Sequence, residues 1–297
     1  MRILTVLLFA SLCSGQALFR AQNVSAGGAT YTGPGDIITS NAIAFWGLRA
    51  YSTATRGNKL ANVCDAGDAH CVDMLSDATT GDAVIPSSNP NCTTSGCTVK
   101  TLYDLTGGTA CGGGAPVVCD ATQATEANRP TLTVNCVNSV HPCLTWTSST
   151  QLLASPITPT QSQPYSATAI GKRTFASAYS ELAAVDTAGP VQLGFTDSAN
   201  TAFIYASLLG TASATDSTFH AVQYMFSGSS SKLSIDGSSS TVNAGTNGFP
   251  GGSGFIVGSA GGNSASGVQS VEVGWWSVDE SALFSALNSN QHSYWGF

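Results

Sequence analysis

The sequence predicts an all-β fold, a two-sheet antiparallel sandwich with a disulfide-stapled N-terminal insertion and one short C-terminal helix. Three observations favour this class. Charged residues make up only 9% of the 297 residues. Short runs of β-forming residues alternate with turns rich in glycine, serine and asparagine. No long stretch repeats apolar residues at helical spacing, so a parallel α/β fold, which needs helices between its strands, is excluded.

Residues 1–17 read as a secretory signal peptide, because a basic start precedes a short apolar run and a small-residue cleavage point. The run is too short to span a bilayer. Residues 18–35 are small, polar and glycine-rich, which predicts a flexible lead-in. We therefore expect a secreted, extracellular protein with one domain over residues 36–297. Asn23 and Asn91 match the acceptor pattern for N-linked glycans.

Eight cysteines remain after the predicted cleavage, and they fall as neighbours in the sequence. An even number in a secreted chain indicates a disulfide framework. Each neighbouring pair closes a loop short enough to form locally, and each bridge would contribute roughly 2–2.5 kcal/mol. A metal site at residues 64–73 is disfavoured, because thiols do not stay free in an oxidising compartment. The predicted pairs are Cys64 with Cys71, Cys92 with Cys97, Cys111 with Cys119, and Cys136 with Cys143.

The first half of the predicted domain has little periodicity. Residues 42–52 are strongly apolar and should be buried. Residues 53–145 carry all the predicted disulfides and only two strand-like runs, at 99–104 and 131–134. We expect this half to be a long stapled insertion of loops that lies over the sandwich, because it has too little apolar sequence for a core of its own.

Strand signals become regular from residue 165 onward, with turn residues between them, as in an antiparallel sandwich. The predicted strands are 165–170, 191–195, 202–207, 221–226, 232–235, 255–257 and 268–276.

The clearest hairpin signal covers residues 218–242. Two runs of β-formers flank a polar turn at 227–231. Leu233 and Ile235 share one face of the second run and polar residues share the other, which predicts a strand with one side on a core. We expect His220 to pack at the base of this hairpin.

One helix is expected near the C-terminus. Ser277 to Glu280 read as a capping box, and Leu283, Phe284 and Leu287 share one helical face.

Two resemblances to known families follow from these motifs. The hairpin, with its Leu233-x-Ile235-Asp236-Gly237 ending, resembles the central hairpin of laminin-G-like and concanavalin A-like lectin domains. A closer resemblance, over roughly residues 40–297, is to the catalytic domain of fungal family 54 α-L-arabinofuranosidases, and it implies a concanavalin A-like jelly roll. It depends on the order of four segments: Arg49-Ala50-Tyr51-Ser52, Ser76-Asp77, Cys92 to Cys97, and Tyr103-Asp104-Leu105-Thr106-Gly107.

The resemblance also implies that the catalytic carboxylates are lost. Retaining glycosidases need two carboxylates about 5–5.5 Å apart. The family's nucleophilic glutamate corresponds to Gln192 and its acid/base aspartate to Asn263, so both positions carry amides here. The vicinal cysteines that floor the family's sugar pocket are also missing. If the protein is nevertheless an enzyme, Glu272 and Asp197 are the candidate catalytic residues.

Side-chain parity predicts a ligand-binding face independently of the resemblance. Gln192 alternates with apolar residues, and Glu272 and Trp276 alternate with valines, so all three face away from the core. An aromatic plane beside polar groups suits a sugar ring. The predicted ligand-binding residues are therefore Gln192, Glu272, Trp276 and Asn263. The alternatives are that Trp276 is core beneath the 53–145 insertion and that Glu272 is a structural carboxylate.

The formal net charge of −7, without a basic patch, excludes nucleic acid and anionic membranes as partners. A neutral polysaccharide or glycan is the expected partner, and self-assembly through sheet edges is an alternative. No cofactor is expected, although Asp197 and Asp216 lie in loops where calcium could bind. These observations favour a secreted carbohydrate-binding protein that does not cleave its ligand. The alternatives are an α-L-arabinofuranosidase-like hydrolase and a structural or adhesive surface subunit.

Overall fold

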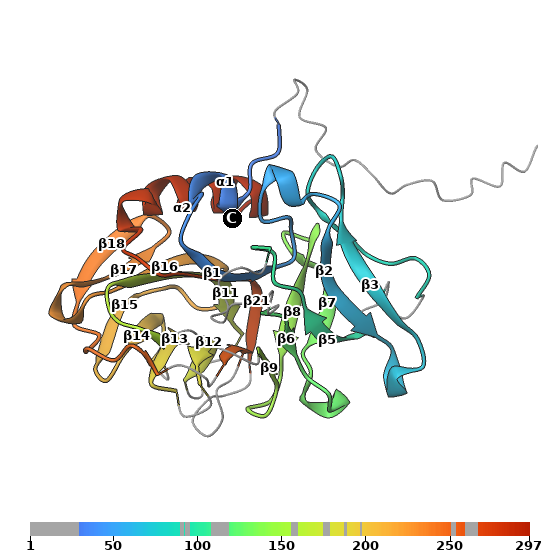
Figure 1. The fold of residues 1–297 in the computed structure, drawn as a ribbon. Helices are drawn as coiled ribbons and strands as arrows, with labels where there is room; N and C mark the ends of the chain where they lie inside the picture. The colour runs from blue at the N-terminus through green and yellow to red at the C-terminus, as the bar shows by residue number, and fades with distance from the viewer. Residues whose placement is uncertain are drawn as a thin grey trace, which may run out of the picture. The chain divides into compact units, whose positions relative to one another are not determined.

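Antiparallel strands are the predominant secondary structure in the part of the chain that the structure describes (Figure 1). The computed structural model describes residues 30–89, 92, 96–107, 119–155, 160–174, 179–186, 189–196, 198–250, 254–258 and 267–297. The helices and strands all lie within residues 31–297, the larger of the two units of the chain. No helix among the described residues is long and apolar enough to cross a membrane. The predicted signal peptide and both glycan acceptors, Asn23 and Asn91, lie outside the described residues.

One group of strands is built around β21 (Val268–Trp276). One edge of β21 pairs with β11 (Tyr165–Arg173). The other edge pairs with β1 (Ala42–Gly47) through its second half and with β8 (His141–Trp146) through its first residues. The strands beyond β11 are, in order, β16 (His220–Phe226), β17 (Ser231–Ile235) and β18 (Ser238–Val242).

A second group forms an antiparallel meander. Its members are, in order, β15 (Leu209–Ser213), β14 (Thr201–Tyr205), β13 (Val191–Phe195), β12 (Ser180–Val185), β20 (Phe255–Gly258) and β9 (Leu152–Ala154).

Strands from residues 59–137 join the two groups. β9 pairs with β6, β6 with β5, β5 with β7, and β7 with β8, while β2 lies between β5 and β3. Their bounds are β2 (Lys59–Cys64), β3 (Cys71–Ser76), β4 (Ala83–Val84), β5 (Thr98–Leu102), β6 (Ala121–Thr122) and β7 (Thr131–Val137). Residues 53–145 therefore contribute strands to the sheet, and the expectation that they form loops over a sandwich is wrong.

The all-β antiparallel class and the C-terminal helix are confirmed, but the expected division into two separate sheets is not. Nineteen strands of the described chain belong to one hydrogen-bonded network, and only β10 (Thr160–Gln161) and β19 (Phe249–Pro250) pair apart from it. Among the joining strands, β5 and β7 match the predicted strand-like runs at 99–104 and 131–134. The others were missed because they are short and interrupted by cysteine-rich turns, so they lack a clear period of two.

The main core is aromatic. Trp275 of β21 is fully buried, and its ring lies 5.5 Å from those of Phe249 and Phe255 and 6.3 Å from that of Phe226. Rings at these separations pack favourably, and each buries a large apolar area. The predicted hairpin is confirmed as β16 and β17, and it places Leu233 in this core.

Disulfides stabilise the connecting strands. Three predicted pairs are present: Cys64–Cys71, Cys92–Cys97 and Cys136–Cys143. Cys119 is also disulfide-bonded, and its predicted partner Cys111 lies outside the described residues. Three disulfides indicate that the chain folds in an oxidising environment.

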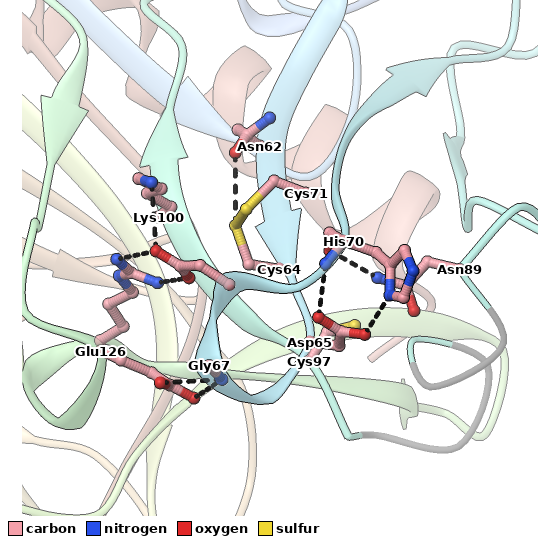
Figure 2. Close-up of a disulfide and its surroundings, with 12 residues drawn as sticks. Asn62, Cys64, Asp65, Gly67, His70, Cys71, Asn89, Cys97, Lys100 and Glu126 are labelled. Carbon is pink, nitrogen blue, oxygen red and sulfur yellow. Dashed lines mark hydrogen bonds and ion pairs between the residues drawn. A yellow bond between two sulfur atoms is a disulfide. The ribbon is translucent and has the colours of Figure 1, made fainter.

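Figure 2 shows the bridge that closes the hairpin of β2 and β3, where Cys64 and Cys71 lie directly opposite each other. Beside it, Asp68 forms ion pairs with Lys100 at 3.1 Å and with buried Arg129. Cys64, Asp68 and Cys71 lie close enough together to suggest metal ligands. However, both sulfurs are used by the disulfide and the carboxylate by the cations, which supports the structural interpretation.

The C-terminal helix lies against the outer face of the β21 group. Helix α2 (Phe284–Trp295) and the short α1 (Pro34–Ile37) lie side by side on the same side of β1 and β16 (Figure 1). Phe284 and Leu287 are buried, as their shared helical face predicts. The helix begins later than expected, after a 3₁₀ turn at Ser281–Leu283, so Ser277 does not cap it.

A buried ion pair lies beneath α2. Arg49 and Glu272 contact each other and have fully buried side chains. Glu272 also accepts hydrogen bonds from the Trp295 indole at 2.7 Å and from the Gln291 amide at 3.1 Å. The Arg49 guanidinium donates to Asn290 at 2.9 Å and lies 4.4 Å from the centre of the Tyr294 ring. The last turns of α2 therefore supply polar partners to a charge pair inside the protein, while the Nη1 atom of Arg49 is buried without a hydrogen-bond partner among the described residues.

Replacing one member of this pair should be strongly destabilising. We expect Glu272→Gln to lower the free energy of unfolding by about 3–5 kcal/mol, because Arg49 would keep its charge without a counterion. The measurement is urea denaturation followed by tryptophan fluorescence. The double variant Arg49→Met/Glu272→Leu, which removes both charges, should recover much of that loss. A loss of less than about 1 kcal/mol for Glu272→Gln would equal the stability contribution of a solvent-exposed ion pair and would contradict this account.

Candidate functional site

The structure does not bring the predicted ligand-binding residues together. Gln192 lies on β13, whereas Glu272 and Trp276 lie on β21, and these two strands do not pair. Gln192 is half-buried beside Gly189, and its role in binding stays a prediction. Asn263 and Asp197 lie outside the described residues.

The expectation that Glu272 and Trp276 face an open surface is wrong. Each is only 1% exposed. Parity was correct, since both point away from the Trp275 core, but that face is covered. The Phe45 ring lies 6.4 Å from the Trp276 ring, and α2 covers Glu272. The contacts that cover these two side chains come from β1 and α2.

The calcium hypothesis for Asp216 is also not supported by its contacts. Both carboxylate oxygens of Asp216 accept hydrogen bonds from buried Arg173, at 2.6 and 2.7 Å. These bonds lower the pKa of Asp216 despite the opposing effect of partial burial. The carboxylate is thus already neutralised by a cation of the protein.

An open cleft lies elsewhere, where β2 meets the segment that follows β5. Its volume is about 500 Å³. Its walls are formed by the turn before β2 with the first residue of β2, by the end of β3, and by the segments that follow β5 and precede β6. It is lined by Thr55, Gly57, Asn58, Lys59, Leu75, residues 103–107 and Asp120.

One side of the cleft is a hydrogen-bonded network centred on Asp73. This carboxylate accepts hydrogen bonds from the Tyr103 hydroxyl at 2.7 Å and the Asn62 amide at 2.9 Å, and it pairs with the Lys59 ammonium at 2.6 Å. Burial opposes its ionisation, but these donors together lower the pKa of Asp73. The same ammonium lies 5.6 Å from the centre of the Tyr103 ring, so the ring is held in place by two charged neighbours.

The other side contains two carboxylates. Asp104 follows β5, and its side chain accepts hydrogen bonds from the main-chain N–H groups of Phe45 and Thr106, each at 3.1 Å. Asp120 accepts a hydrogen bond from the Asp104 N–H at 2.8 Å. Burial raises the pKa of both carboxyl groups.

This arrangement suits a ligand rich in hydroxyl groups. The cleft offers an ammonium, an amide and hydroxyls as donors, carboxylates as acceptors, and the ring of Tyr103 together with Leu75 as apolar surface. Sequence analysis quoted the segment 103–107 only as part of a family motif. No sequence signal connects it to Asp120, because the two meet only through the β5–β6 register that pairs Leu102 with Ala121.

Comparisons with known proteins relate the fold to carbohydrate-active enzymes. No family model and no curated protein matches the chain. Among solved structures, a family 54 α-L-arabinofuranosidase mutant soaked with 4-nitrophenyl α-L-arabinofuranoside matches with a TM-score of 0.63 at 15% identity. An arabinofuranosidase complexed with arabinofuranosyl-α-1,2-xylobiose matches with a TM-score of 0.60 at 15% identity.

The resemblance is one of fold. In both matches the alignment covers 89% of this chain and 65% of the other chain. The expectation drawn from the sequence motifs, a fold like that of the family 54 catalytic domain, is therefore confirmed. At this identity the comparison does not extend to catalysis, and the loss of the catalytic carboxylates stays a prediction.

The pKa of Asp120 is raised and the pKa of Asp73 is lowered, so replacing each of them with asparagine should change stability in opposite directions. The raised pKa of Asp120 means that its ionisation above about pH 4 costs stability, so Asp120→Asn should raise the urea midpoint at pH 7 and leave it almost unchanged at pH 3. The asparagine oxygen can still accept the hydrogen bond from the Asp104 N–H.

Asp73→Asn is the control and should do the reverse. The lowered pKa of Asp73 contributes stability that is present above about pH 4 and is lost as the pH falls, so this substitution should lower the midpoint at pH 7. Two variants that shift the pH 7 midpoint in the same direction would contradict the assignment of these shifts.

Proposed function

We propose that the protein is a secreted carbohydrate-binding protein whose ligand, a neutral oligosaccharide, occupies the Tyr103 cleft without being cleaved. The observation that carries the proposal is the cleft itself, in which a fixed aromatic ring lies among side chains that donate hydrogen bonds and side chains that accept them. A pyranose or furanose presents apolar C–H groups to such a ring and hydroxyl groups to the polar side chains. The similarity of fold to arabinofuranosidases supports the ligand class.

The absence of cleavage is supported by the hydrogen bonds and the ion pair that the carboxylates in and beside the cleft already make. Asp104 accepts hydrogen bonds from the main chain and from the Thr106 hydroxyl at 2.9 Å. Asp73 is paired with Lys59. Both carboxylates are thus engaged by donors of the protein itself, which leaves Asp120, whereas retaining hydrolysis needs two carboxylates that are free to react. The amides of Gln192 and Asn263, at the positions that correspond to the family's catalytic pair, point the same way.

Binding to an array of neutral arabino- and xylo-oligosaccharides, followed by titration calorimetry on the best ligand, tests this proposal. We expect Tyr103→Ala to weaken binding by about tenfold, because an aromatic contact contributes on the order of 1 kcal/mol. Tyr103→Phe is the matched control, since it keeps the ring and should bind nearly as wild type. Full binding by Tyr103→Ala would show that the ligand lies elsewhere.

The two alternatives make different predictions for the same protein. A hydrolase of the family 54 type would release nitrophenol from 4-nitrophenyl α-L-arabinofuranoside, and that result would overturn the non-catalytic part of the proposal. A structural or adhesive subunit would bind none of the oligosaccharides and would associate with itself in solution.

A further inference from the structure

One carboxylate connects the central hairpin to the C-terminal helix. Asp236 lies in the turn after β17, and its Oδ2 is 2.6 Å from Nδ1 of His220 on β16. Its Oδ1 is 3.1 Å from Nε2 of His292 on α2 and also accepts a hydrogen bond from the Ala221 N–H at 3.0 Å. Two imidazoles from segments far apart in the sequence therefore share one acceptor.

The contacts of both imidazoles determine their protonation. Nε2 of His220 lies 2.6 Å from the Thr215 carbonyl oxygen, and Nδ1 of His292 contacts the Phe297 carbonyl oxygen. Carboxylate and carbonyl oxygens only accept hydrogen bonds, so these contacts favour a proton on each of the four ring nitrogens. The Thr218 hydroxyl, 3.0 Å from Nε2 of His220, donates to the Thr215 carbonyl at 2.9 Å and so can also accept from that nitrogen.

The surrounding charges agree with this state. His220 is buried, which opposes its charge, but its hydrogen bonds to Asp236 and Thr215 outweigh burial and raise its pKa. Asp216 contributes a further negative charge near His220, although it is paired with Arg173 at 2.6 Å.

Lys172 places a positive charge close to Phe219, the neighbour of His220 in the sequence. Its ammonium lies 4.9 Å from the Phe219 ring, and that ring stacks on the ring of Phe297 at 6.1 Å.

The helix end adds a second reason for positive charge. His292 lies in the last turn of α2, and its carbonyl accepts the hydrogen bond from the Gly296 N–H at 2.8 Å that ends the helix. A cation at a helix C-terminus interacts favourably with the partial negative charge there. One turn earlier, the Asn288 amide faces Gly237, where a Cβ atom would lie at 3.1 Å, so the helix packs tightly on the hairpin turn.

We propose that His220, Asp236 and His292 form a pH-sensitive clasp that holds α2 on the hairpin in acid and weakens above neutral pH. A histidine with a raised pKa contributes stability that is complete below its ordinary value of about 6.5 and is lost as the pH rises through the folded value. Because α2 covers Glu272, loosening the clasp increases exchange at the buried ion pair. This inference does not depend on carbohydrate binding.

Hydrogen exchange of the full chain at pH 5.5 and pH 8, corrected for intrinsic rates, tests the clasp. We expect the protection of the α2 amides to fall severalfold between the two pH values, and the protection of the β11 amides to change little, since His292 joins the clasp from α2. Asp236→Asn and His292→Gln should each remove the difference. His70→Gln, which alters an exposed histidine paired with buried Asp65 in the β2–β3 loop, should leave it intact.

Two results would overturn the proposal. The first is an NMR titration in which either His220 or His292 is neutral at pH 6. The second is α2 protection with the same pH dependence in the wild type and in His292→Gln. The conservative change at His292, which lies on the surface side of the clasp, keeps the test valid if Asp236→Asn does not fold.

Discussion

The Arg49–Glu272 ion pair is the interaction on which the β21 face depends. Moving two charges out of water costs several kcal/mol per ion, and their attraction offsets this only when the remaining donors and acceptors are satisfied. Here Trp295, Gln291 and Asn290 supply such partners, all three from α2, and only the Nη1 atom of Arg49 is left without one among the described residues. The pair therefore requires the helix, and the helix obtains its most specific contacts from the pair.

This dependence extends further into the sheet. Gln291 also donates to the Thr168 hydroxyl at 3.1 Å and accepts from the Gln223 amide at 2.8 Å, so a single buried network joins β11, β16 and β21 to α2. A network of this kind fixes the register of the helix, because a shift by one turn would leave several buried polar groups unpaired. It also closes the face on which a ligand was first expected, whereas the Tyr103 cleft is open.

The sequence predicted features that depend on local pattern and missed those that depend on pairing over long distances. The hairpin of β16 and β17 followed from alternation, and the bridge Cys64–Cys71 from spacing. Parity assigned Trp276 to the correct face of its strand, but parity says nothing about what covers that face. Phe45 of β1 packs against Trp276, and Glu272 is covered by α2 and paired with Arg49, which lies more than two hundred positions away in the sequence. Likewise, Tyr103 and Asp120 became neighbours only through the β5–β6 register.

The pairing of the protein's cations with its own carboxylates explains why a neutral ligand fits this protein. Arg49, Arg129 and Arg173 are almost completely buried, and each is paired with a carboxylate, namely Glu272, Asp68 and Asp216. In a chain with few charged residues, these three arginines hold a helix and two loops to the sheet. Few cations remain to attract an anion, and in the cleft the Lys59 ammonium is already bound to Asp73. Recognition there must rely on hydroxyl, amide and aromatic contacts, which are the contacts that an uncharged sugar makes.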